Sequence, residues 1–506
     1  MLRKIKDFSW WKDYLLCLFS AVFLALSFLS FKLWFFSWFG FVPLFFALKD
    51  KSKLKAFILA YLTGFIFWLG TIYWLVYVTL IGTVLLSLYL ALYFSIFGLF
   101  VKHHLSEATY YELLFIPSVW VLLEYIRSYL FTGFPWAFLA YSQYRNLAVI
   151  QIADITGSWG VSFLIVLVNL TIYFFLSKKP RYIFCLFCLF IVLIYGLFRL
   201  YRIQTVEYKP QNKGIRVAVI QGNIPQELKW DSQQKDFILN RYLSLTSQVA
   251  REKPDLIIWP EAALPVVLEE EPIYFKRIDD LVKNINIPIL LGAVTLRNNL
   301  YYNSAILVYK NNKDIAQYNK LHLVPFGEYV PLKKILAFLE TVVPIGDFSP
   351  GKEYTLFKLP FNNLESNFSV LICFEDLFSE LARKFVKKGA QFLVNITNDA
   401  WYKKTPAPFQ HLSASVFRAI ENRVFLVRSA NTGISGFIGP DGRIISLVKD
   451  KLGREIFVTG YTTERIFVNQ KGLSFYTRYG DIFVGLCLLF ILKRMVSSIF
   501  SGKKAA

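Results

Sequence analysis

Residues Tyr318–Glu328 read YNKLHLVPFGE and form one of three motifs in the only long polar region of this chain. The other two are Ile257–Glu261 (IIWPE) and Val370–Asp376 (VLICFED), in which an apolar, strand-like run leads to a chemically active side chain. A lone cysteine after a strand is usually a small buried apolar residue, but here it is accompanied by an acid and a lysine. The three motifs together offer the base, the cation and the nucleophile that thiol-based acyl chemistry requires: Glu261, Lys320 and Cys373.

The composition around these motifs indicates a membrane protein. The chain has 506 residues, of which 55% are hydrophobic and 18% charged, whereas soluble domains have about 25% charged residues. Apolar runs of about 17–25 residues are candidate transmembrane helices. Seven precede the polar region and an eighth follows it: Tyr14–Ser30, Leu33–Leu48, Leu54–Val78, Leu80–Val101, Leu113–Phe131, Val161–Leu176, Tyr182–Leu200 and Asp481–Leu492.

Two alternatives concern these spans. The third and fourth nearly touch, so they could form one long bent span. The first follows Arg3, Lys4 and Lys6 and could be a signal peptide, although no persuasive small-residue cleavage site comes after it.

The net charge of +21 has two interpretations. One is nucleic-acid binding. The other is the positive-inside rule, because much of the excess lies in short loops between spans. The basic loops fall on the side of the N-terminus, and an odd number of spans then places the polar region outside the cytoplasm. These loops are Lys49–Lys55, Lys102, Lys178–Arg181 and Lys493–Lys504.

The sequence therefore predicts a membrane domain (1–200), an extracytoplasmic domain (213–467) and a C-terminal transmembrane helix (481–495). In the polar domain, short β-branched runs alternate with helical patterns, which indicates α/β layering. The expected strands are Ile215–Ile220, Asp255–Trp259, Ile289–Val294, Ala305–Tyr309, Ser369–Cys373, Phe392–Thr397 and Phe425–Ser429. The expected helices are Asp231–Arg251, Ser379–Lys388 and Phe409–Asn422. Periodicity does not give the order of the strands.

Cysteine usage fits a single reactive thiol. Four of the five cysteines lie in apolar spans, and Cys373 is the only one in the polar domain. This distribution could be chance, or it could protect a functional thiol from forming an internal disulfide. The scattered His residues and the Cys residues form no metal-binding pattern.

With spans on both sides, these motifs resemble the Glu-Lys-Cys triad of the nitrilase superfamily and, within it, the apolipoprotein N-acyltransferase family. The resemblance includes Gln221–Gln226 (QGNIPQ), Lys229–Asp231 (KWD) and Thr132–Trp136 (TGFPW). It implies a multi-span helical membrane domain plus an α/β domain in which two sheets pack face to face between helices, an α-β-β-α sandwich. It implies no metal or nucleotide cofactor.

The resemblance also assigns roles. Glu261 is the general base, Cys373 the nucleophile, and Lys320 stabilises the oxyanion with the backbone N–H of Phe374. Phe374 stands where similar enzymes have Tyr or Phe, so no phenolic hydroxyl acts there. Supporting or substrate-binding roles fall to Glu328, Glu375, Trp230, Asn398 and Trp401, with Arg423 as a further candidate for the site wall. Trp230 lies in a polar stretch and could be an ordinary packing residue, whereas the resemblance implies that it contacts lipid chains on a mobile arm.

Glu124 and Arg127 lie three residues apart inside a span. Charged groups inside a membrane are costly and usually pair or line a pathway. A structural ion pair and contact with a lipid headgroup both fit this spacing.

The implied activity is phospholipid–apolipoprotein N-acylation in the bacterial inner membrane. Cys373 takes an acyl chain from a phospholipid, and the thioester passes it to the α-amino group of an S-diacylglyceryl-cysteine. The expected partners are these two lipids and the bilayer, not nucleic acid. The alternatives are a membrane-tethered nitrilase or amidase acting on a soluble amide, and a non-enzymatic transporter or scaffold. Acyl-chain preference, headgroup preference and oligomeric state do not follow from the sequence.

Overall fold

The computed structural model describes residues 10–106, 109–179, 183–203, 214–229, 231–310, 316–329, 347–361, 364–468 and 472–502. The chain divides into two units. The helical unit comprises Met1–Tyr201 and Tyr479–Ala506, and the sheet unit comprises Arg202–Arg478.

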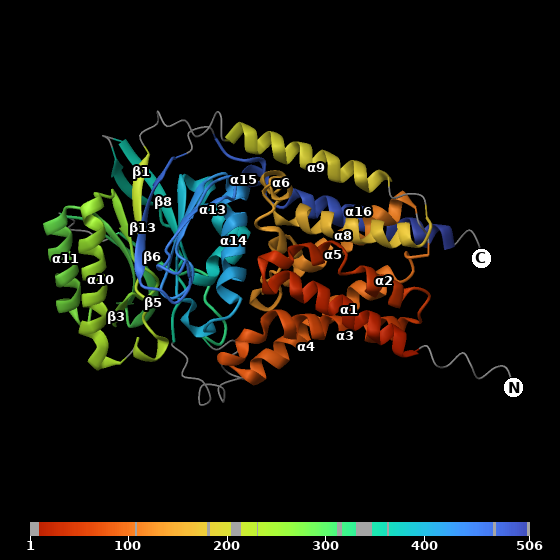
Figure 1. Cartoon of the computed structure of the whole chain (residues 1–506), viewed down its shortest axis with the longest axis horizontal. Helices are drawn as coiled ribbons and strands as arrows, with labels where there is room; N and C mark the ends of the chain where they lie inside the picture. The colour runs from red at the N-terminus through yellow and green to blue at the C-terminus, as the bar shows by residue number, and fades with distance from the viewer. Residues whose placement is uncertain are drawn as a thin grey trace. The chain divides into compact units, whose positions relative to one another are not determined.

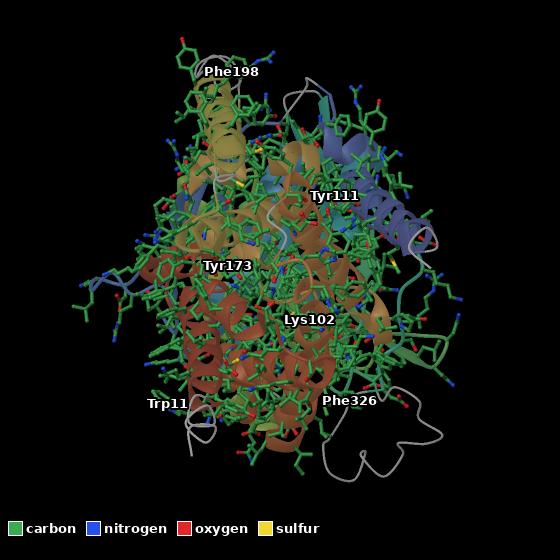
Figure 2. The ribbon with its side chains drawn as sticks, turned by 90° about the vertical axis from the view of Figure 1, so that its right-hand side faces the viewer. Trp11, Lys102, Tyr111, Tyr173, Phe198 and Phe326 are labelled. Carbon is green, nitrogen blue, oxygen red and sulfur yellow. The ribbon has the colours of Figure 1, made fainter. Side chains whose placement is uncertain are left out.

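The helical unit is built from long apolar α-helices joined by short helical turns (Figure 1). Its α-helices are α1 (Trp10–Leu29), α2 (Val42–Leu48), α3 (Lys53–Ile72), α4 (Leu80–Val101), α5 (Tyr110–Arg127), α6 (Leu147–Ile150), α7 (Ala153–Thr156), α8 (Ser158–Leu176), α9 (Ile183–Arg202) and α16 (Ile482–Gly502). Six described segments are long and apolar enough to cross a membrane: Trp11–Leu29, Phe31–Leu48, Lys53–Tyr77, Leu80–Val101, Ser158–Leu176 and Cys185–Arg202. Large apolar side chains such as Phe198 of α9 project outward from this unit (Figure 2), as expected of a surface that faces lipid.

The third and fourth expected spans are two separate helices. The Tyr61 hydroxyl of α3 donates a hydrogen bond to the carbonyl of Leu88 in α4, at 3.2 Å. The backbones approach closely where small residues meet, since a Cβ added to Gly98 would lie 2.6 Å from the Cβ of Ala60. Small residues at such contacts are typical of helices packed within membranes. The alternative of one long bent span is wrong.

The second expected span is broken rather than continuous. A 3₁₀ helix, Phe31–Trp38, is followed by a bend and then by α2. Unpaired backbone groups are costly away from water, and the buried side chain of Asn169 in α8 satisfies two of them. Its Oδ1 accepts from the N–H of Phe41, and its Nδ2 donates to the carbonyl of Ser37, both at 2.8 Å. The apolar run Leu33–Leu48 gives no sign of this bend, which depends on a residue distant in sequence.

Glu124 and Arg127, both buried in α5, bind the irregular segment that follows this helix. The Arg127 guanidinium donates to the carbonyls of Phe134 and Trp136, each at 2.7 Å. The Glu124 carboxylate accepts from the N–H of Leu139 at 2.9 Å. Both charges therefore satisfy backbone groups of a non-helical stretch, which is a structural role.

The sheet unit contains two mixed sheets. One has seven strands in the order β13-β1-β2-β4-β5-β6, with β3 also paired to β4, and the other has six in the order β12-β11-β10-β9-β8-β7. The strands of the first are β1 (Ile215–Gln221), β2 (Leu256–Ile258), β3 (Leu264–Val267), β4 (Ile289–Arg297), β5 (Leu300–Val308), β6 (Ala316–Asn319) and β13 (Gly460–Ile466). Those of the second are β7 (Phe357–Phe361), β8 (Leu364–Ile372), β9 (Phe392–Thr397), β10 (Phe425–Ala430), β11 (Gly436–Ile438) and β12 (Ile444–Leu447).

The two sheets pack face to face between pairs of helices. The Ser429 hydroxyl of β10 lies between the sheets and reaches the carbonyls of Ile220 in β1 and Ile258 in β2, at 3.0 and 3.2 Å. Helices α10 (Lys235–Val249) and α11 (Pro272–Ile285) lie on one side of the sheets, and α13 (Ser379–Lys388) and α14 (Ala407–Asn422) on the other (Figure 1). The expected α-β-β-α sandwich is confirmed.

Candidate active site

Cys373 occupies a strained turn at the end of β8. It is the first residue of a 3₁₀ helix, Cys373–Leu377, and its φ of +51° is in the left-handed region. Residues other than glycine seldom adopt this conformation, and such strain is concentrated at functional sites. The Asn395 amide of β9 holds the turn by donating to the carbonyls of Leu371 and Cys373, at 3.0 and 3.1 Å. The thiol is thus presented by a fixed backbone.

Glu261 lies just after β2, where its backbone packs closely against Gly292 of the neighbouring strand β4. A Cβ added to Gly292 of β4 would lie 2.6 Å from the Cα of Glu261, so only glycine fits at that point. The next residue, Ala262, has a φ of +44°. The sharp turn after the strand directs the carboxylate toward Lys320, whose Nζ lies 3.6 Å from Glu261 Oε1.

Lys320 is almost completely buried, with 1% of its surface exposed. Its Nζ also lies 2.9 Å from Oε1 of Glu328. The Glu328 side chain accepts from the N–H of Val324 at 2.7 Å as well, which closes the loop on itself. The lysine therefore faces two carboxylates.

Asn303 of β5 connects these two carboxylates. Its Nδ2 donates to Oε1 of Glu261 and to Oε1 of Glu328, each at 2.8 Å. Its backbone carbonyl accepts from the N–H of Lys320 at 2.9 Å. The amide orientation is fixed, because both neighbours are acceptors. Sequence reasoning missed Asn303, which looks like an ordinary polar residue of a strand.

Glu375 connects the loop that follows Lys320 to the turn at Cys373 by hydrogen bonds to both. Its buried carboxylate accepts from the Tyr318 hydroxyl and from the backbone N–H groups of Leu321, His322 and Ile372, at distances of 2.7–3.0 Å. Burial raises the pKa of Glu375 to about 7, although the N–H groups of Ile372 and His322 favour the carboxylate. The side chain thus acts on the site by holding its two loops together.

The electrostatics of the thiol determine what chemistry is possible. Burial raises the pKa of Cys373, the Glu261 carboxylate raises it further, and Lys320 opposes both. Burial alone would lower the pKa of Lys320, but Glu328 and Glu261 outweigh it and raise the pKa above its usual value. The resting site therefore holds a protonated thiol and a charged lysine. Since the thiolate is the nucleophile, a base must take the proton as the sulfur attacks.

A buried charged cluster lies behind the cysteine turn. Its members are Asp376, Asp399, His411 and Arg428, all fully or nearly fully buried. Arg428 lies 3.1 Å from an oxygen of each aspartate, and the His411 ring lies 2.8 Å from Asp376 and 2.9 Å from Asp399. His411 Nε2 is also 3.3 Å from the carbonyl of Cys373. The cluster thus supports the turn from inside the sheet unit.

The remaining expected site residues have varied surroundings. Asn398 is buried and bonds to Gln226 at 2.8 Å and to Asn431 at 3.0 Å, which fixes the loop after β1. Trp401 is exposed. Arg423 is buried at the end of α14 and donates to the carbonyl of Pro440 at 2.9 Å, a structural contact. Trp230 lies outside the described residues.

Phe374 is buried and packs against Phe378 and the His322 ring, with ring centroids 5.2 and 6.1 Å apart. The role of its backbone N–H stays a prediction. Within the described parts of the chain, no three His, Cys, Asp or Glu side chains are arranged to hold a metal ion.

Asn303 gives a direct test of this arrangement. In Asn303→Asp, a third carboxylate would face Glu261 and Glu328, and both hydrogen bonds would become repulsive contacts. We expect the reaction of Cys373 with an acyl donor to slow by about 100-fold or more, the lower range for loss of a positioned base. Single-turnover rates measure this effect. Asn298→Asp, the same change on the exposed turn between β4 and β5, should react at the wild-type rate; equal rates in both variants would contradict a role for Asn303.

Comparison with known proteins gives matches to both units. The family model of the apolipoprotein N-acyltransferase N-terminal domain matches residues 20–171, and that of carbon-nitrogen hydrolase matches residues 216–459. An apolipoprotein N-acyltransferase of Geobacter metallireducens is 38% identical, covering 94% of this chain and 93% of the relative. One of Rickettsia prowazekii is 30% identical over 88% of this chain and 90% of its own length. A solved amidase of the nitrilase superfamily from Nesterenkonia is 18% identical and covers 51% of this chain and 92% of the amidase, with a TM-score of 0.39.

Proposed function

Because this chain belongs to the apolipoprotein N-acyltransferase family, we propose that it acylates the N-terminal amino group of lipoproteins, using Cys373 as the nucleophile and a membrane phospholipid as the acyl donor. The observation that carries this proposal is that Glu261 and Lys320, whose charged groups lie 3.6 Å apart, both interact electrostatically with the half-buried thiol of Cys373. The enzyme is a membrane acyltransferase, and its apolar helices suit substrates that are themselves lipids.

The first half-reaction forms a thioester. The sulfur of Cys373 attacks the ester carbonyl of the phospholipid while Glu261 takes the thiol proton. The tetrahedral oxyanion forms near Lys320 and the N–H of Phe374, and preorganised donors of this kind are commonly worth about 3–4 kcal/mol each. Collapse breaks the bond to the glycerol oxygen, which leaves with the proton from Glu261 as a lysophospholipid.

The second half-reaction transfers the acyl chain. The α-amino group of an S-diacylglyceryl-cysteine attacks the thioester, and Glu261 removes a proton from the amine. The amide forms as the sulfur leaves, and the proton on Glu261 returns to the thiol. Glu328 and Asn303 keep Glu261 and Lys320 in place through both steps, because their hydrogen bonds join the two side chains.

Acyl transfer between two defined lipids tests the function. Purified enzyme is given a phospholipid labelled in one acyl chain and a peptide that begins with S-diacylglyceryl-cysteine. We expect the label in an amide at the peptide's N-terminus and one lysophospholipid for each amide formed. Turnover of a soluble amide, with the peptide left unlabelled, would instead support the tethered amidase.

The distribution of basic loops predicts the side of the membrane on which the reaction occurs. Lys49–Lys55, Lys178–Arg181 and the C-terminus belong in the cytoplasm by the positive-inside rule. The six apolar segments named above and α5 (Tyr110–Arg127), which carries three charged residues, together make seven spans before the sheet unit. Seven spans carry residues 213–467 to the outer face of the bacterial inner membrane. An exported lipoprotein meets the site there. An alkaline phosphatase fusion after Gly214 should be active, and one after Lys493 inactive. An active reporter of cytoplasmic location, such as green fluorescent protein, at Gly214 would overturn this topology.

A further inference from the structure

Lys229 is a second buried lysine close to Cys373, and the mechanism above gives it no task. It lies in the loop after β1, with 3% of its surface exposed. Its Nζ donates a hydrogen bond to the main-chain carbonyl of Glu261 at 3.0 Å. Its charge interacts with the Glu261 carboxylate and with the Cys373 thiol. The loop and the hydrogen bond therefore hold an ammonium group at the reacting centre.

The two lysines of the site differ in their partners. Lys320 faces the carboxylates of Glu328 and Glu261, at 2.9 and 3.6 Å, so its positive charge is largely offset before the thiol ionises. Among the described residues, no carboxylate lies within ion-pair distance of Lys229, whose hydrogen bond is to a neutral carbonyl. A buried ammonium that makes no close ion pair is costly. The Glu261 carboxylate acts on Lys229 only from beyond ion-pair distance, so negative charge that forms on the thiol adds a second anionic neighbour.

We propose that Lys229 is a second cation of the active site and stabilises the thiolate of Cys373. In this step the S–H bond breaks, an O–H bond forms on Glu261, and the negative charge moves from the carboxylate to the sulfur. When Glu261 becomes neutral, Lys229 keeps its hydrogen bond, because that bond is to the backbone carbonyl. Its electrostatic partner then changes from the Glu261 carboxylate to the thiolate. The catalytic use of this thiolate rests on the proposed function. The ionisation of the Cys373 thiol itself can be measured separately from acyl transfer.

The protonation state of Lys229 suits this task. Burial lowers the pKa of Lys229 to about 8, while Glu261 and Cys373 act in the opposite direction. The ammonium form therefore predominates at neutral pH. Other charged or titratable groups around the thiol are the same in every Lys229 variant, so a difference between variants reports on Lys229. These groups are Glu261, Lys320, Asp399, Tyr402 and His411.

Alkylation of Cys373 by iodoacetamide tests the proposal without any lipid substrate. The full-length protein in detergent is alkylated from pH 6 to pH 10, and the Cys373 peptide is followed by mass spectrometry. Loss of an opposite charge beside an ionisable group shifts its pKa by about 1–3 units. Lys229→Met should therefore alkylate at least about tenfold more slowly than wild type at pH 7, because a smaller fraction of its thiol is ionised. Lys229→Arg, which keeps the charge, should restore part of the rate.

The matched control is Lys388→Met. Lys388 also donates to a backbone carbonyl, that of Tyr354 at 2.6 Å, but it is exposed at the end of α13. Its variant should alkylate as wild type does. Lys229→Gln, with its unfolding temperature measured, replaces Lys229→Met if the latter does not fold. Wild-type alkylation in a folded, uncharged Lys229 variant would overturn the proposal. If wild type accepts no acyl chain from phospholipid, the proposed function fails, while the alkylation rates still decide the role of Lys229.

Discussion

Glu261→Gln is expected to slow the acylation of Cys373 by about 10²- to 10⁴-fold, the range for loss of a general base. Glutamine keeps the shape of the side chain but cannot take the thiol proton. The base is essential because burial and the nearby carboxylate keep the thiol protonated at rest. Single-turnover experiments with labelled phospholipid measure acylation, and addition of the acceptor peptide to the acylated enzyme measures the second step.

Lys320→Met provides the contrast to this variant. It removes a charge near the oxyanion of both half-reactions, so acylation and transfer should both slow. Glu353→Gln makes the same change as Glu261→Gln at an exposed position and should leave both rates unchanged. If Glu261→Gln and Lys320→Met both acylate at the wild-type rate while folded, the roles given to these residues are wrong.

Arg428→Met should have the largest effect on stability. The guanidinium is fully buried and lies 3.1 Å from both Asp376 and Asp399. Its removal leaves two buried carboxylates with His411 as their remaining cation, and breaking a buried ion pair in this way costs about 3–5 kcal/mol. Denaturant unfolding of the full-length protein, followed by tryptophan fluorescence, measures the change.

Arg454→Met is the matched control. Arg454 pairs with Asp450 at 2.6 Å, but the arginine is largely exposed, and surface pairs contribute about 0–1 kcal/mol. If Arg428→Met and Arg454→Met lower the free energy of unfolding by similar amounts, the buried cluster does not stabilise the sheet unit.

The same cluster predicts how stability depends on pH. Burial and Arg428 favour neutral His411, but Asp376 and Asp399 outweigh them and raise its pKa from 6.5 to about 9. The stabilisation of the folded protein by charged His411 is therefore complete below pH 6.5 and is lost as the pH rises through 9. Burial opposes the charge on Asp399, yet His411 and Arg428 lower its pKa from 3.8 to about 2. The stabilisation of the folded protein by ionised Asp399 is present above pH 3.8 and is lost as the pH falls through 2.

The sequence predicted those parts of the fold that local patterns encode. The apolar runs leading to Glu261 and Cys373 are strands β2 and β8, since their β-branched residues are buried in a sheet. The pattern failed for β6 (AQYN) and β13 (GYTTERI), which are polar and gain order from their partners: β13 pairs along its whole length with β1, which is far away in sequence. Short strands such as β11 offer too few residues for a period to appear.

Part of the candidate site is likewise visible in the sequence and part is not. Glu261 and Cys373 are visible because each follows an apolar, strand-like run, and Lys320 because it lies in the motif Tyr318–Glu328. The role of Asn303 is not visible in the sequence. It depends on hydrogen bonds from its amide to Glu261 and Glu328, which are 42 and 25 residues away in the chain. Lys229 was visible only as part of a resembling motif, and its significance comes from burial against Glu261. The sequence also predicts that the apolar segment Val342–Ile345 and the arm around Trp230 contact the membrane interface, where Trp is favoured. Val342–Ile345 and Trp230 itself lie outside the described residues, so these roles stay predictions.

The acyl-enzyme is the most direct test of the central claim. The purified full-length protein is incubated with a phospholipid of defined acyl chains and no acceptor, then digested and analysed by mass spectrometry. We predict one acyl group on Cys373, removable by hydroxylamine, with none on the four cysteines of the apolar helices, and no label or turnover in Cys373→Ala. An acyl group on a different residue, or acyl transfer that persists in Cys373→Ala, would contradict the account.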